Sequence, residues 1–369
     1  MNYPSDDGQR TLDVLHKLVA FDTRNPPRTL NKHSEVFSWL RDQLPGFKIR
    51  LIDEGNGSVT LLAVRGKPTL LFNYHLDTVP VAEGWSRDPF RLLVTESKAI
   101  GLGACDIKGA LAVMLSTCQS VDNDAALLIT SDEEAGNSTC VRRFLDTYHG
   151  YKRIVVAEPT QCKAVTSHRG IVSGRLSFHG VAGHASSARA INDSAVHRAM
   201  RWGAAALDAL EANAEHPDEV LHDVRLNIGH FEGGVKPNMI AASATAAFNL
   251  RIPPSSDQDG IVDALVNLAD PDHVAGLELP FKAPALPTAK RGPAALSEAA
   301  ILAGELGVEI SDPVDFWTEA ALFSEAGMNA LVLGSGDIEQ AHTADEWVAL
   351  DQLETLHDVY TRILQHGVE

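Results

Sequence analysis

The chain has 369 residues, of which 44% are hydrophobic and 22% charged, and its formal net charge is −18. This length is more than one hydrophobic core usually holds, so we expect two domains. The acidic balance and the lack of any basic run argue against nucleic-acid binding. No apolar run approaches the ~20 residues that span a bilayer, and the polar segment Met1–Arg10 lacks the apolar core of a signal peptide. We therefore expect a cytoplasmic protein that acts neither on nucleic acid nor in a membrane.

Helical and strand-like segments alternate in the first part of the chain. Helical periodicity covers about residues 9–21 and 32–44, and a hairpin-like stretch follows at 48–65. Further helices are predicted at about 108–121 and 138–148. They separate three compact apolar runs without alternation, as expected for strands buried on both faces: Thr69–Tyr74, Ala125–Thr130 and Arg153–Ala157. This order predicts an α/β fold with a largely parallel sheet flanked by helices.

The middle of the chain has a different order of elements. A strand at 171–179 and a helix at 193–212 precede strands at 224–230 and 244–252, a helix at 257–268 and a strand near 277–281. This β-α-β-β-α-β order is the ferredoxin-like split βαβ pattern. The α/β rhythm returns with a helix at 294–306, a strand at 330–333 and a final helix at 350–365. We predict one domain from residues 1–170 and 283–369, and an inserted α+β domain from residues 171–282.

Acidic and imidazole side chains follow the ends of the predicted buried strands. In an open α/β sheet, the ligand site lies beyond the carboxyl ends of the strands. If the strands are parallel, these side chains meet at one edge of the sheet. The residues concerned are His75, Asp77, Glu133, Glu134, Glu158 and His342.

These residue types suit a metal site. His75 and Asp77 share one face of a strand end, and a metal-bound histidine usually gives its second N–H to a carboxylate. Asp106 precedes a predicted helix, where it could cap the helix or bridge two ions. Glu133 and Glu134 could lie in an exposed loop, or one could bind metal while the other acts as general base. Nitrogen and oxygen ligands without thiolate suit Zn²⁺ or Co²⁺, and two ions bridged by a carboxylate form a known hydrolytic arrangement.

Several motifs stand together in one order along the chain. They are HLDTVP at His75–Pro80, GLGACDIKGA at Gly101–Ala110, SDEEAG at Ser131–Gly136, AEPT at Ala157–Thr160, GHAS at Gly183–Ser186 and AHTADE at Ala341–Glu346. With them the chain resembles the M20 family of metallopeptidases and deacylases over essentially its whole length. Four further segments are similar to the acetylornithine deacetylase branch, which includes deacetylases that prefer N-acetylcitrulline. These are FDTRNPP at Phe21–Pro27, HRG at His168–Gly170, WTEA at Trp317–Ala320 and GSGDIEQAHTADE at Gly334–Glu346.

The resemblance implies a zinc-exopeptidase-like catalytic domain with two zinc ions, or cobalt, per subunit. It also implies a homodimer formed through the inserted domain, which would act as a lid. His75 and Glu158 would bind one ion and Glu134 and His342 the other, with Asp106 between them. By the same resemblance, Asp77 would support His75 and Glu133 would be the general acid/base. His184 would stabilise the oxyanion in the active site of the partner subunit. Arg251 and Asn238 would hold the substrate carboxylate.

By the same resemblance the expected reaction removes the acetyl group from N2-acetyl-L-ornithine, giving L-ornithine and acetate in arginine biosynthesis. N-acetyl-L-citrulline is an alternative substrate, which ends in a neutral ureido group instead of a cation. Glu319 could pair with an ornithine ammonium group. A dipeptidase or carboxypeptidase on the same metal site is a second alternative. No GxSxG segment supports a serine hydrolase, and no metal position is missing, which argues against an inactive binding protein.

Overall fold

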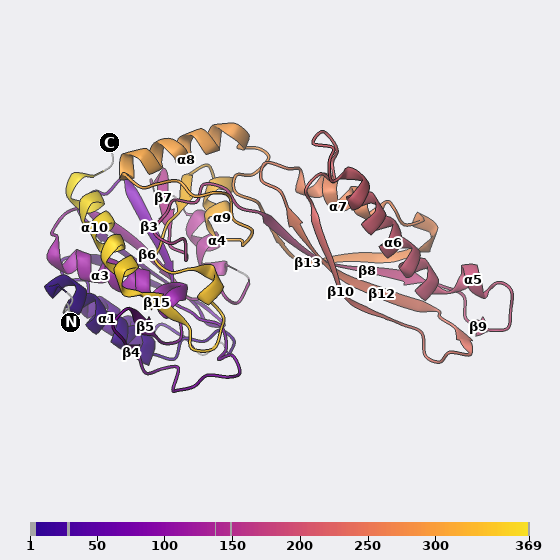
Figure 1. Ribbon diagram of the computed structural model, residues 1–369, viewed down its shortest axis with the longest axis horizontal. Coiled ribbons are helices and arrows are strands. Elements are labelled where there is room, and N and C mark those ends of the chain that lie inside the picture. The colour runs from indigo at the N-terminus through magenta and orange to yellow at the C-terminus, as the bar shows by residue number, and fades with distance from the viewer. Residues whose placement is uncertain (1–4, 28–29, 137, 148–149, 368–369) are drawn as a thin grey trace. The chain divides into compact units, whose positions relative to one another are not determined.

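The computed structural model describes residues 5–27, 30–136, 138–147 and 150–367, and the chain divides into two compact units (Figure 1). The first unit comprises Met1–Ser167, Pro293–Pro313 and Thr318–Glu369, and the second comprises His168–Gly292 and Val314–Trp317. These ranges differ from the predicted boundaries at residues 168–170, 283–292 and 314–317, which belong to the second unit. The backbone of His168 pairs with both Leu286 and Val314, so these returning segments pack with the second unit.

The first unit is built on a six-stranded, mostly parallel sheet, as predicted. Its strand order is β1-β2-β6-β3-β7-β14, and the last four strands run parallel to one another. The first two strands form an antiparallel hairpin whose turn includes Asn56 at a φ of 52°. The bounds are β1 Lys48–Gly55, β2 Ser58–Arg65, β3 Leu70–His75, β6 Ala125–Thr130, β7 Arg153–Val156 and β14 Asn329–Val332.

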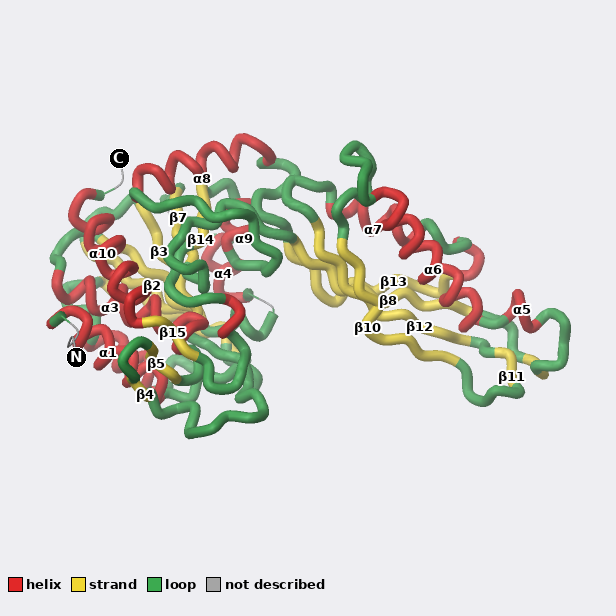
Figure 2. Tube along the Cα trace, viewed as in Figure 1, coloured by secondary structure: helices red, strands yellow, loops and turns green. Residues whose placement is uncertain are grey.

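Helices cover both faces of this sheet (Figure 2). On one face α3 (Gly109–Ser120) packs against α1 (Asp6–Ala20) and α10 (Leu350–His366), and its residues 109–118 are all buried. On the other face, α4 (Thr139–Leu145) and α9 (Ala320–Glu325) meet through the rings of Phe144 and Phe323, whose centroids lie 6.3 Å apart. The unit also contains α2 (Glu35–Asp42), α8 (Gly292–Leu306) and a small sheet of β4 (Leu93–Val94), β5 (Lys98–Ile100) and β15 (Trp347–Ala349).

The second unit is a four-stranded antiparallel sheet with the predicted β-α-β-β-α-β order. Its strand order is β10-β12-β8-β13. Trp202 is central to its core, contacting Phe178 and Phe248 and donating a 2.9 Å hydrogen bond to the carbonyl of Leu265, which ties α6 to α7. The bounds are β8 Gly170–His179, α6 Ala195–Asn213, β10 Arg225–Gly233, β12 Ser243–Ile252, α7 Gln258–Val266 and β13 Val274–Ala283, with the short elements β9 Gly183–His184, α5 Ala190–Asp193 and β11 Met239–Ile240.

The longest described helices are α6 and α10, with 19 and 17 residues. Even α6 and α10 carry several charged side chains along their length. Within the described ranges, no helix combines the length and the apolar character needed to cross a bilayer.

Candidate metal centre

The five predicted metal ligands come from five separate segments of the first unit. His75 ends β3, Glu134 follows β6 and Glu158 follows β7, while Asp106 precedes α3 and His342 lies in the loop after β14. Carboxyl ends of parallel strands share one edge of a sheet, which brings these segments together. Donor atoms within 4.8 Å of one another form three groups: His75 with Asp106 and Glu158, Asp106 with Glu134 and His342, and His75 with Glu133 and Glu134.

Asp106 is shared between two of these groups. Its Oδ1 lies 3.0 Å from Nε2 of His75, and its Oδ2 lies 3.3 Å from Nε2 of His342. Glu158 Oε2 lies 3.8 Å from the His75 nitrogen, and Glu134 Oε1 lies 3.0 Å from the His342 nitrogen. Each oxygen of Asp106 therefore faces a different imidazole, which is the arrangement expected of a carboxylate between two cations.

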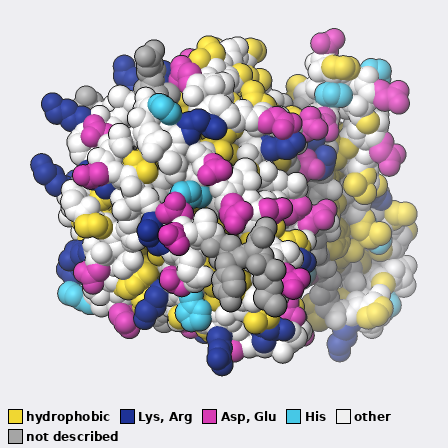
Figure 3. Space-filling view, turned by 60° about the vertical axis from the view of Figure 1, so that its left-hand side comes forward, with side chains coloured by type: hydrophobic (Ala, Val, Ile, Leu, Met, Phe, Trp, Pro, Cys, Tyr) yellow, Lys and Arg dark blue, Asp and Glu magenta, His cyan; other side chains and the backbone are white. Residues whose placement is uncertain are grey.

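The centre is buried on one side and open on the other. Asp106, Glu158 and His75 are 6%, 5% and 3% exposed, whereas the side chain of His342 is 52% exposed. Figure 3 shows histidine and acidic side chains next to one another on the forward face of the first unit. The open side gives a small molecule access to His342.

The buried carboxyl groups of the centre would need bound cations to be fully ionised. Burial raises the pKa of Glu158 to about 7, and burial, followed by the charge of Glu158, raises the pKa of Glu133 well above its usual range. Hydrogen bonds to Asp106 and Glu134 raise the pKa of His342 to about 10. Buried carboxylates retain protons unless positive charge compensates them, and divalent cations would supply that charge. The imidazole and carboxylate donors fit zinc.

Asp77 holds two parts of the centre. The sequence predicted a carboxylate contact with His75, but Nδ1 of His75 lies 3.0 Å from the Asp77 carbonyl oxygen and 3.8 Å from its carboxylate. The buried carboxylate instead accepts hydrogen bonds from the backbone N–H groups of Glu133 (3.3 Å) and Glu134 (3.0 Å). Asp77 therefore orients the Glu133–Glu134 loop with its side chain and the His75 ring with its backbone.

Glu346 is a supporting residue that the sequence analysis did not single out. It is 2% exposed, and its carboxylate accepts hydrogen bonds from the backbone N–H groups of Gly103 (2.9 Å), Cys105 (2.9 Å) and Asp106 (3.0 Å). Because it lies four residues after His342, it ties the segment carrying one predicted ligand to the turn carrying another. The signal available in the sequence was its place at the end of the AHTADE motif, but Asp345 beside it is equally acidic.

Two glycines allow the His342 loop to approach the other segments. A Cβ atom on Gly334 would lie 2.5 Å from the carbonyl oxygen of Glu158. Gly336 has a φ of +99°, and a Cβ atom there would lie 2.6 Å from Sγ of Cys105. A larger residue at either position would push the loop away from the centre.

Glu319 lies in the first unit and is 1% exposed. Burial raises the pKa of its carboxyl group to about 8, and its charge contributes to the raised pKa of Glu133. Its Oε1 atom has no hydrogen-bond partner among the described residues. This burial leaves little of the Glu319 side chain for an ornithine ammonium ion to contact.

The remaining predicted residues lie in the second unit. His184 is exposed, contacts Ser186 Oγ through Nδ1 at 2.8 Å, and pairs with Met239, so it lies close to Asn238. Asn238 lies a few residues before the first residue of β12, whereas Arg251 lies near the last residue of that strand, paired with Ile171. About eight strand residues, roughly 25 Å, separate the two ends. One chain therefore does not bring Asn238 and Arg251 to the same carboxylate.

Comparison with known proteins identifies the family. Residues 71–366 match peptidase family M20/M25/M40. The chain is 48% identical to an N-acetyl-L-citrulline deacetylase from Xanthomonas campestris, over 96% of this chain and 97% of that protein. It is 28% identical to an acetylornithine deacetylase from Proteus mirabilis, over 97% and 95% of the two chains.

Solved structures agree with this assignment at the level of the fold. An aminopeptidase from Bacillus cereus matches with a TM-score of 0.75 and 18% identity, over 97% of this chain and 98% of that one. A tripeptidase from Staphylococcus aureus matches with a TM-score of 0.69 and 20% identity, again over 97% and 98%. The chain belongs to peptidase family M20/M25/M40.

Proposed function

We propose that this protein is a dinuclear zinc amidohydrolase that removes the acetyl group from an N-acetylated amino acid. The observation that carries the proposal is the position of Asp106, whose two carboxylate oxygens lie 3.0 and 3.3 Å from the imidazoles of His75 and His342. This geometry provides two adjacent donor sets, completed by Glu158 and Glu134. Cobalt would suit the same donors.

Each residue of the proposed active site has its own role in the reaction. Two divalent ions bound here would polarise the amide carbonyl and acidify a water molecule towards neutrality. Glu133 accepts the proton of the attacking water and later returns it to the leaving amine, which is general acid–base catalysis. Asp77 holds the backbone of Glu133 in place through its carboxylate. His184 donates a hydrogen bond to the oxyanion of the tetrahedral intermediate.

The second unit would supply substrate binding and the dimer contact. Arg251 would pair with the substrate carboxylate, and Asn238, with His184 beside it, would reach the site of the partner subunit. Arg251 and Asn238 lie toward opposite ends of β12, and this separation supports the division between two chains. Exposed apolar side chains on this unit, including Met200 (58%), Leu207 (49%) and Phe231 (40%), offer surface for such a homodimer.

Complementation between two inactive variants would test the shared site. In a C2 dimer, co-expressed Glu133→Gln and His184→Ala chains form heterodimers in which one of the two sites has both residues intact. We expect the mixture to recover roughly a quarter of the wild-type rate of acetate release if the chains pair at random. If the mixture stays as inactive as its parents while tandem affinity purification of differently tagged chains recovers heterodimers, His184 does not act across subunits.

N2-acetyl-L-ornithine and N-acetyl-L-citrulline are the two candidate substrates, and similarity to known proteins favours N-acetyl-L-citrulline. The family resemblance of the sequence favours N2-acetyl-L-ornithine, with N-acetyl-L-citrulline as the alternative. The 48% identity to an N-acetyl-L-citrulline deacetylase, against 28% to an acetylornithine deacetylase, supports N-acetyl-L-citrulline as the substrate of this chain. Burial of Glu319 also weakens its proposed pairing with an ornithine ammonium group. A neutral ureido group has both donors and an acceptor, so it can hydrogen-bond to the Glu319 carboxyl group in either protonation state.

Steady-state kinetics on both substrates would test the proposal. We expect acetate release from N-acetyl-L-citrulline with a kcat/KM at least about tenfold above that for N2-acetyl-L-ornithine, a difference of about 1.4 kcal/mol in transition-state binding. Chelator should abolish both activities, and added zinc should restore them. Faster release of free amino acids from dipeptides than of acetate from either substrate would favour a peptidase instead.

A further inference from the structure

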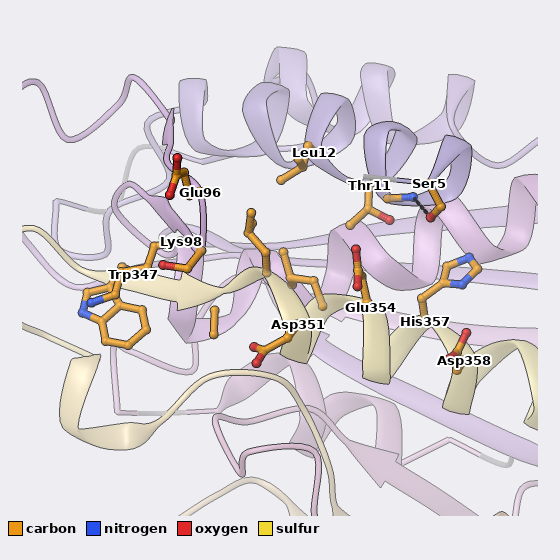
Figure 4. A pocket seen from close by; sticks show the side chains of 15 residues that line it. Ser5, Thr11, Leu12, Glu96, Lys98, Trp347, Asp351, Glu354, His357 and Asp358 are labelled. Atoms are coloured by element: carbon orange, nitrogen blue, oxygen red, sulfur yellow. Dashed lines mark hydrogen bonds between the residues drawn. The ribbon is translucent and has the colours of Figure 1, made fainter. Parts of the chain in front are cut away.

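A groove on the first unit lies between α1 and α10 and contains none of the predicted metal ligands. Its volume is about 670 Å³, within the range of small-molecule sites. Figure 4 shows Thr11 and Leu12 projecting into it from α1, with Glu354 and His357 opposite them on α10. Lys98 of β5 and Trp347 of β15 line one end. The groove is therefore framed by four elements of regular structure.

The lining of the groove is acidic. Four carboxylates, all on exposed residues, face one lysine, Lys98, whose Nζ lies 3.5 Å from the ring centroid of Trp347. Such an excess of one sign favours ligands of the other sign. The carboxylates are those of Glu96, Asp351, Glu354 and Asp358.

Two buried polar atoms in the walls have no partner among the described residues. Thr11 is 2% exposed, and its hydroxyl oxygen makes no hydrogen bond within the described ranges. Nε2 of His357, on the opposite wall, is also a buried atom without a hydrogen bond among the described residues. Buried polar groups are nearly always paired, so two unpaired ones in a single groove point to a ligand. A hydroxyl oxygen and a neutral imidazole nitrogen can both accept from the N–H groups of a cation.

The cation that fits is organic. Among the described residues, groups of three metal donors within 4.8 Å occur only at the metal centre. The groove also has apolar lining from Leu12, Leu350 and Leu353, which an alkyl chain would cover. We propose that this groove binds a small organic cation, an alkylguanidinium or alkylammonium group, outside the metal centre.

Calorimetric titration of zinc-loaded protein with butylguanidinium would test this proposal. We expect saturable binding to the wild type and none of butyrate, an anion of similar length. The double variant Glu354→Gln/Asp358→Asn should bind at least about tenfold more weakly. Thr11→Val, which keeps the side-chain shape, should weaken binding several-fold without lowering the thermal midpoint, because the hydroxyl has no partner to lose. Glu211→Gln, at an exposed position on α6, is the matched control and should bind like the wild type.

Three results would overturn the proposal: no binding to the wild type, equal binding by wild type and both groove variants, or equal binding of butyrate. Equal binding would place the guanidinium elsewhere, for example at the acidic metal centre. Acetate release without the probe should be the same in the groove variants and the wild type. The test therefore stands apart from the proposed deacetylase function.

Discussion

Replacing Glu133 with glutamine should lower kcat for acetate release by roughly 10²–10⁴-fold, the range for loss of a general acid–base group. Glutamine has nearly the same shape but cannot accept the proton of the attacking water. The backbone N–H of residue 133 would still donate to Asp77, so the loop should keep its position. Steady-state rates and zinc content by atomic absorption should be measured on the same preparation.

The zinc content separates two roles that the geometry allows for Glu133. It forms one donor group with His75 and Glu134, so it could in principle bind an ion. If Glu133 acts as a base, the Glu133→Gln variant should keep two zinc ions per chain and lose turnover. The matched variant Glu134→Gln, which changes a predicted ligand, should lose zinc. Loss of an ion from Glu133→Gln would make Glu133 a ligand, and normal turnover would remove it from the mechanism.

Replacing Glu346 with glutamine should weaken zinc binding by about 10–100-fold, as is typical when a residue that orients metal ligands is changed. The carboxylate accepts from three backbone N–H groups, and a glutamine NH₂ would face at least one of them donor to donor. Each N–H left unpaired costs about 1–3 kcal/mol. The turn carrying Asp106 would then lose its fixed position. Competition against a chromophoric chelator measures the affinity.

Asp345→Asn is the control for Glu346→Gln. Asp345 is the adjacent acid, has a φ of 55° that asparagine tolerates, and its side chain accepts hydrogen bonds from Ser86 instead of from the Asp106 turn. Zinc affinity should stay at the wild-type value in this variant. His342→Ala, which removes a predicted ligand outright, should lose one ion per chain. Unchanged zinc affinity in Glu346→Gln would show that the Asp106 turn holds its position without this carboxylate.

Strong local patterns in the sequence predicted the fold well. The short, mostly apolar runs at β3, β6 and β7 predicted buried strands, because a strand covered on both faces carries apolar residues without alternation. The split βαβ order of the second unit was also evident. Short elements such as α9, β5 and β15 were missed, since three strand residues or six helical residues cover fewer than two structural periods.

Four of the five predicted ligands follow strand ends and Asp106 precedes a helix, and the family resemblance supplied their roles. The contacts around them depend on tertiary structure. Which atom of Asp77 faces His75 depends on the backbone path beyond β3, and residue types do not encode it. Glu346 acts on a turn more than 240 residues earlier in the chain, and no local pattern reveals that pairing. The separation of Asn238 from Arg251 likewise depends on the strand register of the second unit.

The five segments that meet at the centre have a consequence for biosynthesis. The first predicted ligand is residue 75 and the last is residue 342, and the whole second unit lies between residues 158 and 342. A ribosome must therefore make most of the chain before the donors around Asp106 and His342 can assemble. An ion finds no compact site on the nascent polypeptide, so metal uptake should follow folding of the first unit rather than nucleate it.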